Sequence, residues 1–289
     1  MYPSRFKYEA PKSVEEAVAL LDAGKGEAKV LAGGQSLIPM LKLRFAFPEQ
    51  LIDINNIPGL DHITFDADGT CHIGALVRHE HLVDSPEIAK LQPTIAAAAP
   101  LVADPVIRTR GTFVGSVCHA DPQGDWAATM IALHGSIIAQ GPKGKRTIAM
   151  KDFVQGPYAN ALNYNEIAIE AIIPAPKGKR VGGYLKLERR VGDFATASVA
   201  VALDMDGDRV IGAGMALAGV GGKTIDANDA AESLIGQTLN AASIAKCAEL
   251  VAAKAEPRSD HRGSSEYKRH LVATFVSRIL TAHSAQKVA

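Results

Sequence analysis

Leu31-Ala-Gly-Gly-Gln-Ser-Leu-Ile-Pro39 joins a predicted strand, residues 28–32, to an apolar stretch that begins at Leu37. Two consecutive glycines, Gly33 and Gly34, let the chain turn sharply and present successive backbone N–H groups, and Ser36 adds a hydroxyl. Such a turn can hold phosphate oxygens, although a plain strand-to-helix turn would use the same residues. The stretch matches neither the GxGxxG dinucleotide-binding loop nor a P-loop with its Lys-Ser/Thr pair.

A second stretch, Arg108-Thr-Arg-Gly-Thr-Phe-Val-Gly-Ser-Val-Cys-His-Ala-Asp-Pro122, has the same chemistry. It also combines glycines, hydroxyls and small residues. The chain has 31 basic and 31 acidic side chains, so two such loops occur on a formally neutral molecule. We therefore expect backbone dipoles, and not a basic patch, to hold a diphosphate, and FAD fits this expectation.

The patterning around the two loops divides the chain into three predicted domains. Residues 1–57 are expected to form an α/β unit, in which the capping box Ser13-Val-Glu-Glu16 begins a helix and a second strand follows at 50–54. Pro58-Gly59 marks the first boundary. Residues 58–176 alternate between strands and helices, which predicts a second α/β unit. The strands are expected at 71–75, 136–139 and 166–173, and the helices at 79–103 and 125–133.

Residues 177–289 form the third predicted domain, which begins after the linker around Pro174 and Pro176. Strands are expected at 184–187 and 197–203, and Asp206-Gly207-Asp208 predicts a hairpin. The remainder is expected to be helical. Apolar residues recur at every fourth position of the last helix, which predicts a buried stripe of Tyr267, Leu271, Phe275 and Ile279.

Composition excludes several classes of protein. The neutral charge argues against a general nucleic-acid or anionic-membrane binder. The chain has only three cysteines, Cys71, Cys118 and Cys247, whereas an iron–sulfur cluster normally takes four thiolates. No apolar stretch is long enough for a transmembrane helix, and the first residues lack the apolar core of a secretory signal. We expect a cytoplasmic protein.

Other candidate chemistry is weaker. His79 and His81, together with Cys118, His119 and Asp121, could suggest a metal, but residues i and i+2 of a helix point apart. We therefore expect no metal site and interpret the histidines as exposed or hydrogen-bonded. Ser36 lacks the second glycine of a nucleophile elbow, and we assign no catalytic residue.

The two loops together resemble the paired flavin-diphosphate loops of the FAD-binding medium subunits of molybdenum hydroxylases. The likeness is greatest to the medium subunits of aerobic carbon monoxide dehydrogenases, and it spans nearly the whole chain. It continues, in the same order, through Ala120-Asp-Pro122, Asp125, Gln155-Gly156, residues 186–195 and Ser259-Asp-His-Arg-Gly263. The resemblance implies an α+β fold with two α/β FAD-binding subdomains, of the vanillyl-alcohol-oxidase or PCMH type. A small antiparallel sheet with a helical bundle would follow them.

The resemblance also implies a site. It places the FAD diphosphate on two loops, Asp125 near the ribose and diphosphate, and Lys186 with the pair Asp193-Phe194 near the flavin ring. The loop residues are Ala32, Gly33, Gly34, Gln35 and Ser36 in the first, and Thr112, Phe113, Val114, Gly115 and Ser116 in the second. Val114 stands where the family usually has glycine, and a β-branched residue disfavours positive φ.

As function, the resemblance implies an oxidoreductase subunit that passes electrons from a partner's iron–sulfur clusters through FAD to an external acceptor. The implied partners are a large molybdopterin-binding subunit and a small [2Fe-2S] subunit, in a dimer of heterotrimers. Two alternatives stay open. One is a stand-alone flavin oxidoreductase that turns over its own substrate. The other, which Val114 motivates, is a flavin-free assembly scaffold.

Overall fold

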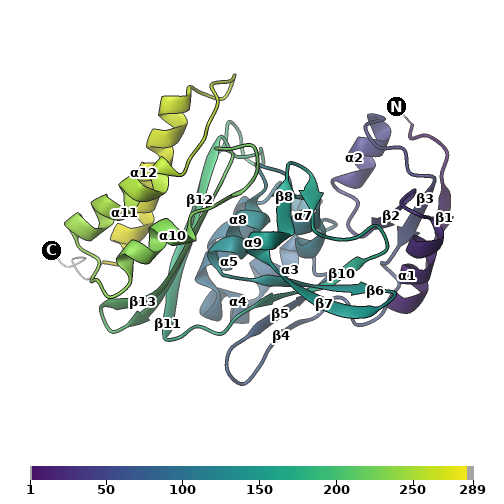
Figure 1. The fold of residues 1–289 in the computed structure, drawn as a ribbon, viewed down its shortest axis with the longest axis horizontal. Coiled ribbons are helices and arrows are strands. Elements are labelled where there is room, and N and C mark those ends of the chain that lie inside the picture. Colours follow the sequence, from purple (N-terminus) through teal and green to yellow (C-terminus); the bar gives the residue numbers. More distant parts are fainter. Residues whose placement is uncertain (1, 285–289) are drawn as a thin grey trace.

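The computed structural model describes residues 2–284. Its three main sheets follow one another along the long axis of the molecule, with helices between them and at the C-terminal end (Figure 1). This arrangement confirms the mixed α and β fold class expected from the sequence.

The first sheet is parallel, with strand order β1-β3-β2. Its elements are β1 (Lys7–Glu9), α1 (Val14–Ala23), β2 (Ala28–Leu31), α2 (Leu37–Lys42) and β3 (Gln50–Asp53). The Ser13 hydroxyl caps α1 by accepting from the Glu16 N–H at 3.1 Å, whereas the Glu16 carboxylate accepts from Lys12 N at 2.7 Å. The reciprocal half of the predicted capping box is therefore shifted by one residue. Strand β1 was not predicted, because three residues carry no readable periodicity.

The second sheet is antiparallel, with strand order β4-β5-β10-β6-β7. Its strands are β4 (Ile63–Phe65), β5 (Cys71–Gly74), β6 (Ser136–Gly141), β7 (Gly144–Ala149) and β10 (Ile167–Ile173). The small pair β8 (Val154–Gly156) and β9 (Ala159–Asn160) lies outside it. The predicted strands β5, β6 and β10 are confirmed. Strand β7 was missed, since almost all of its residues are exposed and no apolar alternation marks it.

Short helices follow in the same part of the chain. They are α3 (His79–Asp84), α4 (Pro86–Leu91), α5 (Pro93–Ala98), η1 (Ala99–Leu101), α6 (Pro105–Arg108), α7 (Phe113–His119), α8 (Asp125–Ala132) and α9 (Met150–Phe153). Helices α7 and α9 contact the second sheet, whereas α5 and α8 contact the third sheet. Helix α8 is buried along its whole length and contains the single tryptophan, Trp126, which is fully buried. Because α8 begins at Asp125, burial of its apolar residues also brings that carboxylate into the interior.

The third sheet is antiparallel, with strand order β11-β12-β13-β14. Its strands are β11 (Lys179–Leu187), β12 (Ala197–Asp206), β13 (Arg209–Ala218) and β14 (Ile225–Asp226). Alternate residues of β12 belong to two different cores. Ala200 and Ala202 join the core shared with the first two sheets, whereas Val199 and Val201 face the C-terminal core. The small alanine face lets the neighbouring helices α5 and α8 pack closely against this sheet.

The C-terminal helices cover the other face of this sheet (Figure 1). They are α10 (Asn228–Ala231), η2 (Glu232–Leu234), α11 (Ala241–Ala253) and α12 (Ser265–Ala282). In α12, Leu271, Phe275 and Ile279 are buried as predicted, but Tyr267 is 45% exposed. The prediction for Tyr267 was wrong because the first turn of α12 extends beyond the layer that it covers. Within residues 2–284, no helix is both long and apolar enough to cross a membrane.

Candidate FAD site

The two glycine-containing loops lie against each other. A Cβ atom at Gly33 would lie 2.4 Å from the Arg110 carbonyl oxygen and 2.9 Å from Thr112 N, so only glycine allows this backbone approach. The next residue, Gly34, has a φ of 75°, which turns the chain from β2 toward α2. Loops that are far apart in the sequence thus form one surface.

The first loop presents backbone donors. Within residues 2–284, no backbone N–H from Gly33 to Leu37 donates to a protein acceptor. The Ser36 hydroxyl makes no capping bond to α2. N–H groups left without partners near a glycine turn fit the oxygen atoms of a diphosphate, so the residues present are suited to FAD.

Two residues that sequence reasoning missed join the loops. The Asn55 amide nitrogen donates to the Ala32 carbonyl at 2.8 Å, and its oxygen accepts from Arg78 Nη2 at 2.6 Å. The other Arg78 nitrogen, Nη1, donates to the Arg110 carbonyl at 2.5 Å. Asn55 and Arg78 therefore bridge the two loops. The only sequence signal was the position of Asn55, two residues after the end of strand β3.

The second loop is largely the first turn of helix α7. Thr112 caps this helix, and its hydroxyl accepts from Gly115 N at 3.2 Å. Phe113 and Val114 are buried, and the Phe113 N–H donates to the Val77 carbonyl at 3.0 Å. These two side chains support the loop from below. Val114 lies within the helix and not among the positive-φ residues, so the strain expected from its branching does not arise.

His79 lies beneath the second loop. Its Nδ1 accepts from the Trp126 indole N–H at 3.0 Å, and a Cβ atom at Gly111 would be 2.7 Å from its ring. Burial, with the charges of Arg108 and Arg78, lowers the pKa of His79 to about 4. A neutral, hydrogen-bonded histidine agrees with its interpretation as structural. Among the described residues, no cluster of His, Cys, Asp and Glu could hold a metal ion.

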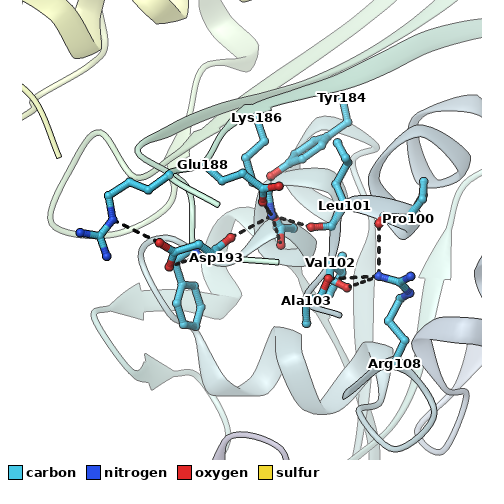
Figure 2. A network of polar contacts seen from close by, with 12 residues as sticks. Pro100, Leu101, Val102, Ala103, Arg108, Tyr184, Lys186, Glu188 and Asp193 are labelled. Carbon is cyan, nitrogen blue, oxygen red and sulfur yellow. Dashed lines mark hydrogen bonds and ion pairs between the residues drawn. The ribbon is translucent and has the colours of Figure 1, made fainter. Parts of the chain in front are cut away.

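Lys186 is the centre of a buried polar network (Figure 2). Its ammonium, with a side chain only 1% exposed, lies 3.3 Å from Asp125 Oδ1 and 3.3 Å from Glu188 Oε2. It also donates to the carbonyls of Leu101 at 2.6 Å and Asp193 at 3.3 Å. Lys186 is thus fully engaged with protein groups, so it orients neighbouring segments and does not reach outward as a free cation.

The carboxylates around Lys186 are incompletely compensated. Burial raises the pKa of Asp125, while the Lys186 ammonium and the Tyr184 hydroxyl, which donates to Asp125 Oδ1 at 2.6 Å, oppose that rise. Burial and the neighbouring Asp125 raise the pKa of Tyr184 well above its usual value. Glu188 Oε2 is buried and has no aligned hydrogen bond within residues 2–284, despite its short distance to Lys186.

The Asp193-Phe194 pair combines a fixed carboxylate with an exposed ring. Burial acts to raise the pKa of Asp193, but hydrogen bonds from Arg262, Phe194 N and Arg189 outweigh it and lower this pKa to about 2. The Phe194 side chain remains 48% exposed. An exposed aromatic ring on a fixed backbone is suited to packing against a planar ligand.

The loop pair and the Lys186 network are linked by the segment 100–103. Arg108, at the start of the second loop, donates hydrogen bonds at 3.1–3.2 Å to three carbonyls of this segment, those of Pro100, Val102 and Ala103 (Figure 2). Lys186 donates to the carbonyl of the remaining residue, Leu101. The structure thus brings Asp125, Lys186 and Asp193 together directly, and connects them to the loops through Arg108. A separate cavity of about 480 Å³, between α1 and the second sheet, is lined by none of the predicted site residues.

Fold and site together define a flavin-binding subunit of a larger oxidoreductase. The family model of the FAD-binding domain in molybdopterin dehydrogenase matches residues 4–176, and that of the carbon monoxide dehydrogenase flavoprotein C-terminal domain matches residues 183–283. The chain belongs to the family of FAD-binding subunits of molybdopterin dehydrogenases. This confirms the resemblance drawn from the two loops and the prediction of FAD as cofactor.

Individual relatives are similar to this chain over nearly its full length. The carbon monoxide dehydrogenase medium chain of Hydrogenophaga pseudoflava is 40% identical over 98% of both chains. The nicotine 6-hydroxylase medium subunit of Paenarthrobacter nicotinovorans is 36% identical over 97% of this chain and 98% of its own. A structure of carbon monoxide dehydrogenase from Hydrogenophaga pseudoflava superimposes with a TM-score of 0.93, at 41% identity over 99% of this chain and 100% of that one.

Proposed function

We propose that this chain is the electron-transfer subunit of a molybdenum hydroxylase complex, in which it takes electrons from a partner's iron–sulfur clusters and delivers them to an external acceptor. FAD, when bound, supplies the redox chemistry, and the chain binds and orients it. The observation that carries the proposal is the turn from Gly33 to Leu37, whose N–H groups have no acceptor in the described part of the chain and which lies against the Arg110–Thr112 backbone.

We propose the following contacts to FAD. The backbone of Ala32 to Ser36 and the loop Thr112 to Ser116 would hold the diphosphate. Phe113 and Val114 would support the second loop from the core, since both side chains are buried. Asp125 would lie near the ribose and diphosphate, and Lys186 would lie near the flavin ring together with Asp193 and Phe194. The proposed domains, 1–57, 58–176 and 177–289, each contain one of the three main sheets.

The proposed partners are a large molybdopterin-binding subunit and a small [2Fe-2S] subunit, assembled as a dimer of heterotrimers. In support, the three cysteines of this chain are free and too few for a cluster. Free thiols also suit a reducing compartment, and we propose the cytoplasm. The similar relatives are named for carbon monoxide and for nicotine, so we assign substrate choice to a partner subunit.

The test is to purify this chain with its partner subunits from cells that produce all three. We expect a complex with about one FAD per copy of this chain. We also expect its flavin absorbance to bleach when the complex receives its reducing substrate and no acceptor. A chain that shows no flavin absorbance in the complex, even after incubation with FAD, would refute the proposal.

The same preparation separates the alternatives. A stand-alone oxidoreductase would turn over substrate as the isolated chain, without molybdenum or iron. A flavin-free scaffold would assemble the complex without FAD, and Val114→Gly would change nothing in its function. The helical conformation of Val114 removes the reason for the scaffold hypothesis.

A further inference from the structure

We propose that Arg262, from the loop before α12, is a positioning residue that fixes the Asp193-Phe194 segment beside the flavin ring. This inference rests on the proposed FAD function and adds to it a residue far from either diphosphate loop. Arg262 lies 69 residues from Asp193 in the chain, and no local pattern connects the two.

The Arg262 guanidinium holds the segment at two points. Nη2 donates to Asp193 Oδ1 at 3.2 Å, and Nη1 donates to the Phe194 carbonyl at 2.8 Å. The Arg262 side chain is only 10% exposed and that of Asp193 12%. One planar side chain thus binds both a carboxylate and a main-chain oxygen, which a lysine ammonium cannot match in geometry.

The loop that carries Arg262 is itself fixed. Asp260 Oδ1 accepts from the Arg262 N–H at 2.8 Å, and the buried Lys268 donates to Asp260 Oδ2 at 2.7 Å. Lys268 also donates to the Arg258 carbonyl at 3.1 Å. Because Lys268 lies on α12, Arg262 is held at a constant position relative to the C-terminal core.

Two further contacts hold the segment. Lys186 donates to the Asp193 carbonyl at 3.3 Å. A Cβ atom at Gly192 would lie 3.1 Å from the Ala103 carbonyl, so the turn before Asp193 packs against segment 100–103. The backbone of residues 192–194 therefore contacts β11, segment 100–103 and the loop that precedes α12.

Only the Phe194 ring is left free, at 48% exposure. A half-exposed ring on a backbone with so many contacts has its position set by those contacts and not by its own packing. Through these contacts, Arg262 would set where this ring lies beside the bound flavin.

The experiment uses Phe194→Trp as a reporter in the purified complex, because an indole that contacts the flavin ring quenches its fluorescence. In this background we compare Arg262→Ala and Arg262→Lys with the control Arg258→Ala, whose exposed side chain makes no hydrogen bond or ion pair within residues 2–284. We expect Arg262→Ala to lengthen the flavin fluorescence lifetime several-fold and Arg262→Lys to give an intermediate value. The control should leave the lifetime unchanged.

A second measurement does not need FAD. Amide hydrogen exchange of residues 192–195 should become about tenfold faster in Arg262→Ala, since two charge-assisted hydrogen bonds are lost. Exchange and lifetime unchanged in Arg262→Ala, or a fully wild-type lifetime in Arg262→Lys, would overturn the role of Arg262. A complex that lacks FAD but shows the faster exchange would refute the proposed function and leave the positioning role intact.

Discussion

At the loop pair, Gly33 approaches the Arg110 backbone so closely that no side chain fits, and the groups facing outward are main-chain N–H donors. Around Lys186, by contrast, side-chain charges meet in the interior, where its ammonium lies beside the carboxylates of Asp125 and Glu188. The loop pair depends on the absence of a side chain at Gly33, whereas the Lys186 network depends on the pairing of buried opposite charges. The two regions should therefore fail in different ways when they are mutated.

The largest expected effect is at the charge network. Lys186→Met removes the ammonium and leaves the Asp125 and Glu188 carboxylates without a compensating cation, which should cost about 3–5 kcal/mol of unfolding free energy. Urea denaturation measures it. The matched control is Lys254→Met, whose pair with Asp229 is exposed on both sides and should be worth about 0–1 kcal/mol. Equal losses in the two variants would contradict the proposed difference.

The next effect is at the loop pair and should appear in binding. Gly33→Ala places a Cβ against the Arg110 carbonyl and separates the loops, which should weaken FAD binding about 100-fold, or about 3 kcal/mol. Titration of the FAD-stripped complex gives the dissociation constant. Gly222→Ala is the control, since its Cβ would have no neighbour within 4 Å. Unaltered affinity in Gly33→Ala would show that the close approach is unimportant.

Val114→Gly should lower the stability of the fold without weakening FAD binding at the loop pair. It removes a buried side chain and adds a glycine to α7, which should lower the unfolding free energy by about 2–3 kcal/mol. FAD affinity should be unchanged or slightly tighter, because the Val114 side chain faces the core. A large loss of affinity in a folded variant would be inconsistent with a purely supporting role.

The smallest effect concerns pH. His79 is neutral when folded, with a pKa of about 4, and protonates near pH 6.5 when unfolded. Its stabilising contribution is therefore full above pH 6.5 and is lost as pH falls toward 4, with about 2 kcal/mol lost between pH 7 and 5. His79→Gln should lack this part of the pH dependence in urea denaturation. Identical pH profiles would exclude His79 as its source.

Part of this comparison could be predicted from the sequence. Gly33 and Gly34 after a strand predicted the first turn, since the conformation of a turn depends on the residue types at adjacent positions. The charge network could not be predicted, because Lys186 and its acceptor Leu101 are 85 residues apart. Lys186, Asp125, Asp193 and Phe194 were reached only through family resemblance, and their contacts to FAD stay a prediction. Asn55, Arg78 and Arg262 were missed because each acts through distant backbone groups.

By itself the sequence determined two glycine turns, the strands and helices with clear periodicity, a neutral surface and too few cysteines for a cluster. The tertiary structure alone decided that the two loops meet, that Asn55 and Arg78 bridge them, and that Lys186 and Arg262 both hold the segment of Asp193 and Phe194. The physical reason is that local conformation follows from neighbouring residues, whereas these contacts exist only after three sheets have packed around shared cores.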